Sequence, residues 1–246
     1  MELVYVATFI VAFISSILSG LAGGGGGFIM APYWLLSGMT PAQGATTGAF
    51  MALGMGGSSL AAFRGSGHMP QNKKLVISLL IMTFIASAIG PFFLQRIDTE
   101  VFKPVLAILT IASLPLLFIK RKDIHISKQN ETIGIVLLGA LLLASSFITS
   151  SAFSIFIAIV LAQVFKLSIL QSTALRRIIG IVQSAVIFGV LAWLGNFLWP
   201  HAIAGILGGA LGSYIGTKLA IKKGEKFAKY ALAVGAVTSS IALFFI

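Results

Sequence analysis

The sequence contains ten apolar stretches in two sets of five, and the second set follows the first about 128 positions later. Matching landmarks support this repeat: Gln43 corresponds to Gln171, and Pro70 and Pro200 each precede a fourth apolar stretch. An odd number of membrane crossings in each half would insert the two halves into the bilayer in opposite directions. The pattern therefore predicts an integral membrane protein built from two inverted repeats.

The composition places these stretches in lipid. Hydrophobic residues make up 58% of the 246 positions and charged residues only 9%, whereas soluble domains are about half apolar and about a quarter charged. The chain has no cysteine, which excludes disulfides and thiolate metal sites. Most of the basic residues behind the net charge of +11 lie in short loops, so we attribute the charge to membrane topology and expect no nucleic-acid partner.

We expect an all-α integral membrane fold with about eight full transmembrane helices and two short, broken or re-entrant segments, 28–37 and 154–165. A full crossing needs about 20 apolar residues, so these two segments are too short to cross alone. Each follows a break in the apolar pattern, and a pair of such breaks at matching positions indicates a transport site. The expected helices are 3–22, 28–37, 42–63, 75–95, 101–119, 132–150, 154–165, 168–193, 201–219 and 228–246.

The loops predict the domain organisation and the orientation. We expect a first membrane repeat at 1–119, a basic cytoplasmic linker at 120–131 and a second membrane repeat at 132–246. Short loops rich in Lys and Arg stay on the cytoplasmic side, which puts both termini outside a plasma-membrane protein. The basic residues behind this assignment are Arg64, Lys73, Lys74, Lys120, Arg121, Lys122, Lys128, Lys218, Lys222, Lys223, Lys226 and Lys229.

The first break is a run of five glycines, which costs a helix about 1 kcal/mol per residue relative to alanine. The freed backbone groups must be buried in protein or line a wet cavity. The helix that follows points its N–H groups and positive dipole end at the break, which favours an anion site. The residues assigned to this site are Gly23, Gly24, Gly25, Gly26, Gly27 and Phe28.

Close helix packing through small residues is the alternative role for glycine in membrane helices. We assign that role to the glycines that recur along the expected helix 201–219. These are Gly205, Gly208, Gly209, Gly212 and Gly216.

The second break is rich in Ser and Thr, and Ser150, Ser151 and Ser154 are its candidate ligands. Hydroxyl groups donate hydrogen bonds to an anion as backbone amides do. They also bond to carbonyls of their own helix four residues back. Both roles stay open for this segment, which also includes Ser145, Ser146 and Thr149.

Arg176 and Arg177 lie inside the expected helix 168–193. A charge at the centre of a membrane helix costs about 2.5–3.5 kcal/mol on insertion scales, so such residues indicate function. A guanidinium group presents a planar fork of donors that matches an oxyanion. The alternatives are a structural clamp on backbone carbonyls and a contact with lipid headgroups. Neighbouring residues point about 100° apart, so we do not assign which arginine faces the pathway.

Four uncharged polar residues complete the candidate site: Gln43, Thr46, Thr47 and Gln171. Their side chains can bond to substrate oxygens, or they can join helices to one another inside the membrane. Both readings stay open. No acidic residue falls inside an expected span, which argues against a sodium site or a proton relay. We therefore expect no metal, no cofactor and no enzymatic centre.

Two stretches resemble the sulfite exporter TauE/SafE family. They are Gly-Leu-Ala-Gly-Gly-Gly-Gly-Gly-Phe-Ile-Met-Ala-Pro at 20–32 and Leu-Leu-Ser-Gly-Met-Thr-Pro-Ala-Gln-Gly-Ala-Thr-Thr-Gly at 35–48. The resemblance implies a transporter of small sulfur-containing anions such as sulfite or organosulfonates. The chain departs from the family pattern where Ser and Thr replace a second glycine-rich motif, and where Arg176 and Arg177 stand opposite Gly48 and Ala49 of the first half.

The expected function is transport of small anions, sulfur oxyanions or organosulfonates, through a site near the membrane midplane between the two repeats. The expected partners are a small anionic substrate and the lipid bilayer. An anion channel is the alternative within transport. A non-transporting membrane assembly or accessory protein, in which the glycines serve only for packing, is the alternative outside it.

Overall fold

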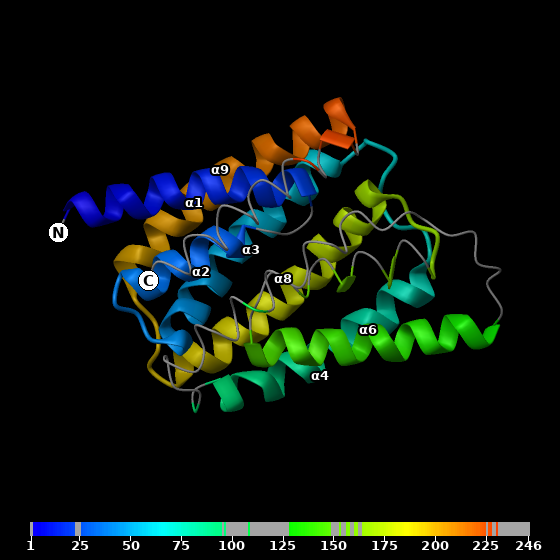
Figure 1. Ribbon diagram of the computed structural model, residues 1–246, viewed down its shortest axis with the longest axis horizontal. Coiled ribbons are helices and arrows are strands. Elements are labelled where there is room, and N and C mark those ends of the chain that lie inside the picture. Colours follow the sequence, from blue (N-terminus) through cyan, green and yellow to red (C-terminus); the bar gives the residue numbers. More distant parts are fainter. Residues whose placement is uncertain are drawn as a thin grey trace.

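The computed structural model describes residues 2–22, 26–94, 96, 108, 128–148, 153, 156–157, 160–161, 164–224, 226–227 and 230. Seven helices are defined within these residues (Figure 1). They are α1 (Glu2–Ala22), α2 (Gly27–Leu36), α3 (Pro41–Phe63), α4 (Lys73–Leu94), α6 (Lys128–Ile148), α8 (Ile169–Trp193) and α9 (Trp199–Lys223).

All seven helices lie within four residues of their expected bounds. The largest differences are the start of α6 at Lys128 and the end of α9 at Lys223, since both helices continue into residues that the charge pattern places in loops. The helix α9 ends where Gly224 adopts a φ of 80°, a left-handed conformation that favours glycine at a helix end. The expected helices 101–119 and 228–246, and most of 154–165, lie outside the described residues.

The described part of the chain is helical and contains no strand. Four of its helical segments are long and apolar enough to cross a membrane: Val4–Leu21, Lys73–Leu94, Ile169–Trp193 and Trp199–Lys223. The helix α3 has 23 residues but is rich in Gly, Ala, Ser and Thr. The expected total of eight crossings stays a prediction.

The helices form a central pair with an outer pair on each side (Figure 1). The central helices α3 and α8 contact each other, α1 and α9 pack together against α3, and α4 and α6 pack together against α8. Among the described residues, exposed large apolar side chains are spread along α1, α4, α6 and α9, whereas α3 has none and α8 has only Trp193 at its end. The outer pairs therefore present the apolar surface that lipid would cover.

The main contacts are preserved when the two halves exchange places. In this exchange α1 corresponds to α6, α3 to α8, and α9 to α4. The contact of α1 with α9 then corresponds to that of α6 with α4, and the contact of α3 with α9 corresponds to that of α8 with α4. Figure 1 shows that the helices of each exchanged pair run in opposite directions along the molecule.

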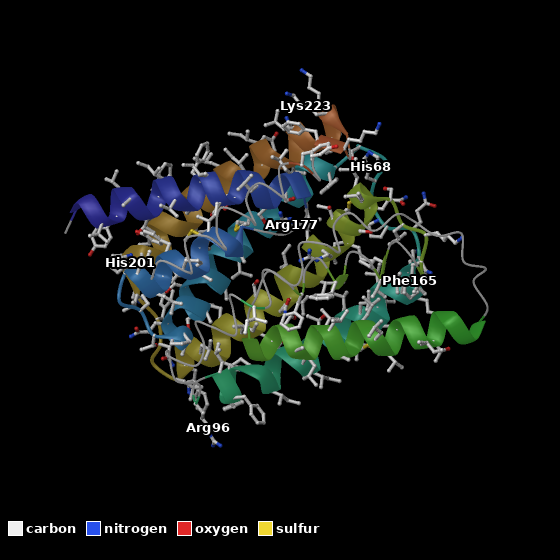
Figure 2. All side chains as sticks on the ribbon, viewed as in Figure 1. His68, Arg96, Phe165, Arg177, His201 and Lys223 are labelled. Carbon is white, nitrogen blue, oxygen red and sulfur yellow. The ribbon has the colours of Figure 1, made fainter. Side chains whose placement is uncertain are left out.

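Basic residues gather at one end of the bundle. The end that carries Arg64, Lys73, Lys74, Lys222 and Lys223 is called the basic end below. Figure 2 shows His68 and Lys223 at this end and Arg96 and His201 at the other. The helices α1, α3 and α9 run toward the basic end, whereas α4, α6 and α8 start there (Figure 1).

Glycines bring the backbones of α1 and α9 close together. A side chain at Gly208, Gly212 or Gly216 would overlap backbone carbonyls of α1, those of Phe9, Phe13 and Ile17. Gly205 and Gly209 lie on another side of α9 and face Met51 of α3. The packing role predicted for Gly208, Gly209, Gly212 and Gly216 is confirmed by these close approaches, whereas an added Cβ at Gly205 would make only ordinary contact with the Met51 side chain.

Candidate functional site

A cavity of about 280 Å³ lies beside the central helices and is lined by residues of both halves. Its wall comes from α1, α2 and α3 in the first half and from α6 and α8 in the second, together with Gly26, Thr40 and Ile157. The polar side chains in the wall are Ser19, Thr40, Ser145, Arg176, Arg177, Gln183 and Ser184.

The start of α2 opens on this cavity. Gly26 precedes the helix, and its carbonyl accepts hydrogen bonds from the N–H groups of Ile29 and Met30 at 3.1 and 3.0 Å. A Cβ atom on Gly26 would lie 2.8 Å from the Ser15 carbonyl oxygen, so the chain passes too close to α1 for a side chain. Gly26 and Gly27 both line the cavity, and Phe28 lies in the first turn of α2.

Arg177 belongs to the second half of the chain and forms hydrogen bonds with the end of α1 in the first half. Its Nη2 atom donates hydrogen bonds to the carbonyl oxygen of Ser19 at 2.5 Å and to Ser19 Oγ at 3.0 Å. Ser19 belongs to the last turn of α1, where carbonyl groups have no partner within the helix. The Arg177 Nε atom is buried without a hydrogen-bond partner in the described part of the chain. Arg177 thus clamps the backbone carbonyl and the hydroxyl of Ser19, and it also lines the cavity.

Arg176 lines the cavity beside Arg177. Both residues are partly buried, and Figure 2 shows Arg177 inside the bundle, between its two ends. Two adjacent cations in a membrane interior repel each other. An anion in the cavity would offset this repulsion.

Gln183 is a polar wall residue that our sequence reasoning missed. Its Nε2 atom donates hydrogen bonds to Ser145 Oγ at 2.8 Å and to Ser146 Oγ at 3.1 Å, which links α8 to α6. The two serine hydroxyls donate in turn to the Leu142 carbonyl of their own helix. An uncharged amide in the middle of the apolar span Ile169–Trp193 was a signal that could have identified it.

Gln43 and Gln171 form matching capping boxes at the starts of α3 and α8. The Gln43 side chain accepts a hydrogen bond from the Thr40 N–H at 3.0 Å, and the Gln43 N–H donates to Thr40 Oγ1 at 3.2 Å. Gln171 and Ser168 make the same two bonds, at 3.0 and 3.1 Å. These side chains stabilise helix starts, and neither glutamine lines the cavity.

The remaining expected site residues lie elsewhere. Thr46 Oγ1 donates to the Ala42 carbonyl of its own helix at 2.6 Å, and Thr47 Oγ1 is buried without a partner in the described part of the chain. Neither threonine lines the cavity. Gly23, Gly24, Gly25, Ser150, Ser151 and Ser154 lie outside the described residues. Of the expected set, the structure brings Gly26, Gly27, Arg176 and Arg177 together in the cavity wall.

The cavity has two different ends. Ser19, Gly26, Gly56 and the two arginines line the end nearer the basic loops, and Trp34, Leu35, Pro41 and Ile187 line the far end. Beyond the arginines, toward the basic end, α1, α3, α8 and α9 meet in an apolar cluster called the plug below. The plug consists of Leu21, Phe63, Leu170, Ala174 and Ala220.

Comparisons with known proteins identify a family and several relatives of this chain. The sequence model of the family described as "Sulfite exporter TauE/SafE" matches residues 8–243. The chain is 28% identical to a "Probable membrane transporter protein" of Haemophilus influenzae over 88% of this chain and 85% of that one. It is 25% identical to the "Probable membrane transporter protein ORF9" of a Sinorhizobium species over 97% of this chain and 90% of that one.

A third relative is the "Probable membrane transporter protein YfcA" of Escherichia coli K12, which is 24% identical over 96% of this chain and 88% of that one. No solved structure matches the chain significantly. Because the family match covers nearly the whole sequence, the chain belongs to the sulfite exporter TauE/SafE family of membrane transporters.

Proposed function

We propose that the protein transports small anions, sulfur oxyanions or organosulfonates, across the plasma membrane. The observation that carries this proposal is a cavity shared by both halves with Arg176 and Arg177 in its wall. A guanidinium group offers paired donors to an oxyanion, and this recognition is strong where water is scarce. The family description, sulfite exporter, supports the sulfur oxyanion as the substrate class.

The start of α2 supplies a second anion-binding element in this proposal. The first N–H groups of a helix have no partner within the helix, and the helix dipole adds a partial positive charge. Gly26 and Gly27 bring this helix start into the same wall as the arginines. Two independent donor groups, one from each half, would then hold one anion.

The exchange symmetry supports inverted repeats at 1–119 and 132–246, joined by a linker at 120–131. Corresponding helices run in opposite directions, which is the arrangement of transporters that expose one site alternately to the two sides. In this proposal the basic end is cytoplasmic and both termini lie outside. Transport then requires the plug to open after the anion has bound.

The test is uptake of radiolabelled sulfite into proteoliposomes that contain the purified protein. Arg176→Gln removes one charged donor, and a charged hydrogen bond of about 1.5–3 kcal/mol corresponds to roughly a 10- to 150-fold loss of affinity. Arg177→Gln would weaken uptake and also destabilise the end of α1, so its thermal stability is measured in parallel. Arg96→Gln, at the opposite end of the molecule, is the matched control.

Normal sulfite uptake by both cavity variants at limiting substrate would contradict the proposal. Counterflow separates transport from a channel: a preloaded unlabelled anion accelerates uptake only if the binding site alternates between the two sides. If the unmodified protein moves no anion under any gradient, the alternative of a non-transporting accessory protein would be favoured.

A further inference from the structure

Arg177 joins two helices that otherwise make little contact. The helix α1 packs along α9, whereas α8 packs against α3 and α4. The hydrogen bonds from Arg177 to the carbonyl and the hydroxyl of Ser19 therefore bridge the space between α1 and α8. A charged donor makes such bonds stronger than those between neutral groups.

This bridge lies directly beside the plug. On α8, Ala174 and Leu170 precede Arg177 by three and seven residues and therefore share its face of the helix. On α1, the plug residue Leu21 follows Ser19 by two residues. Opening the plug moves Leu170 and Ala174 of α8 away from Leu21 of α1. The same movement stretches the bridge between Arg177 and Ser19.

The guanidinium group of Arg177 is only partly used in this bridge. Nη2 makes both bonds to Ser19, and Nε is buried without a hydrogen-bond partner in the described part of the chain. A guanidinium group offers two forks of parallel donors, Nε with Nη2 and Nη1 with Nη2. Nη2 belongs to both forks. An oxyanion that binds through two donors therefore takes Nη2 and competes with Ser19 for it.

The first half of the chain offers Arg177 few other acceptors in the cavity wall. Among the described residues of that half, Ser19 and Thr40 are the wall side chains with a hydroxyl group, and Thr40 caps α3 at the far end. Met30 and Met51 in the same wall are apolar. A buried cation without an acceptor is costly. The empty cavity therefore favours the bridge, and an anion in the cavity favours its release.

We propose that the bridge between Arg177 and Ser19 is a latch that an anion releases. With the cavity empty, Arg177 holds α8 against the end of α1 and keeps the plug closed. An anion that takes a fork of the guanidinium displaces Ser19 from Nη2, and α8 is then free to move away from α1. The anion binds the open state more tightly, because it no longer shares Nη2 there. This inference rests on the proposed anion transport and adds the residue that couples binding to opening.

The experiment measures access to the plug with single cysteines, because the chain has none of its own. Ala174→Cys places a thiol in the plug, and Ser16→Cys places one on α1 where Gly212 of α9 approaches it. Both positions are fully buried. The purified protein reacts with N-ethylmaleimide in methanesulfonate or in chloride at equal ionic strength, since sulfite itself adds to maleimides. We expect methanesulfonate to accelerate labelling of Ala174→Cys about tenfold and to leave that of Ser16→Cys unchanged.

Ser19→Ala gives the sharpest test, because a latch and a ligand predict opposite results. The variant keeps the carbonyl group but removes the hydroxyl that competes for Nη2. We expect it to bind methanesulfonate roughly threefold to tenfold more tightly, measured by thermal stabilisation, and to speed labelling of Ala174→Cys without any anion. Ser37→Ala, whose hydroxyl is exposed and outside the cavity wall, is the matched control. Weaker binding by Ser19→Ala would make Ser19 a ligand of the anion and overturn the inference.

Arg177→Lys separates the latch from the charge. Lysine keeps a cation in the wall, but its ammonium group has three donors that point in different directions instead of a fork. It can therefore hold Ser19 and an anion together. We expect the acceleration of labelling by methanesulfonate to fall from about tenfold to below about twofold while the anion still binds. A full acceleration in Arg177→Lys would contradict the displacement of Ser19.

The outcomes distinguish the latch from the proposed function. Equal labelling of Ala174→Cys in methanesulfonate and in chloride would overturn the latch, and uptake of radiolabelled methanesulfonate into proteoliposomes would then still support transport. Labelling that responds to the anion without uptake of any anion would instead overturn the proposed function and keep the latch. Equal acceleration at Ser16→Cys would indicate general loosening of the bundle and would also overturn the latch.

Discussion

The two outer helix pairs occupy corresponding places beside the central helices, yet they are joined differently. In α1–α9, four glycines meet the main chain of the partner helix: Gly20, Gly208, Gly212 and Gly216. In α4–α6, Gly90 meets the Ser146 carbonyl, but Gly139 meets the flexible Met82 side chain. Four leucines of these two helices, Leu75, Leu79, Leu138 and Leu142, belong to one buried apolar cluster.

This difference indicates which side of the molecule can move. Lipid is as apolar as leucine, so association inside a membrane depends on van der Waals packing and on interhelical hydrogen bonds. Backbone-to-backbone packing has few alternative arrangements, whereas leucine and methionine side chains can change rotamers. We expect α1–α9 to behave as a rigid unit and α4–α6 to rearrange more easily.

The strongest test compares Gly212→Leu with Gly139→Leu. The first places a side chain against the Phe13 carbonyl and should cost about 3 kcal/mol or more, with loss of folded protein. The second meets a movable Met82 and should cost about 1–3 kcal/mol. Thermal unfolding in detergent measures both. Equal losses would remove the distinction between the two pairs.

Cysteine labelling tests the same distinction in the native state. The chain has no cysteine of its own, so Ser16→Cys in α1 and Ser146→Cys in α6 each provide a single, nearly isosteric thiol. Both serines are fully buried. If α4–α6 opens with a free energy about 1.4 kcal/mol lower, a membrane-permeant maleimide should label Ser146→Cys about tenfold faster. Faster labelling at Ser16→Cys would reverse the assignment.

The central helices should show no such asymmetry. Thr40→Ala and Ser168→Ala remove equivalent capping hydroxyls from α3 and α8, and each should lower the free energy of unfolding by about 1 kcal/mol. Ser37→Ala, whose exposed hydroxyl bonds only to the Tyr33 carbonyl of its own helix end, is the control. Chemical unfolding in mixed micelles compares the three. If the two variants lower the free energy of unfolding by different amounts, the central helices also differ between the two halves.

The smallest expected effect belongs to Gly189→Ala on α8. Among the described residues, no atom beyond the neighbouring residues of its own helix lies within 4 Å of the added methyl group, so we expect only the helix propensity to change. The variant should gain up to about 1 kcal/mol of stability. Its melting temperature, measured beside that of Gly208→Ala, separates the effect of contact from that of propensity. A loss at Gly189→Ala would show that glycine matters at this position for another reason.

Much of the helical framework could be predicted, because a run of apolar residues that ends in Gly, Pro or charge has few other interpretations. The errors fell where charged residues continue a helix. The helix α9 continues past Lys218, the first cation of this stretch. The Lys218 ammonium lies 4.6 Å from the centre of the Tyr214 ring, and this cation–π contact within the helix stabilises it there. The start of α6 at Lys128 was missed for the same reason, since a polar first turn resembles a loop.

The site was only partly predictable. Arg176 and Arg177 were conspicuous because charge is rare inside an apolar span. The apolar wall at Met30 and Met51 could not be found, since an apolar residue looks the same in sequence whether it faces lipid, core or cavity. For Gln43 and Gln171 the sequence left open both substrate binding and bonding between helices. The Thr-x-x-Gln and Ser-x-x-Gln spacing is typical of a capping box, but the helix starts had to be known before it could be assigned.

The plug beyond the arginines also has an electrical consequence. Phe63 and Ala220 are fully buried in it, so this layer offers no solvation to a passing ion. In the proposed transport cycle, the plug is an insulating layer between the arginines and the basic end. The membrane would then keep its voltage while the site is occupied, because ions would cross this layer only when the plug opens.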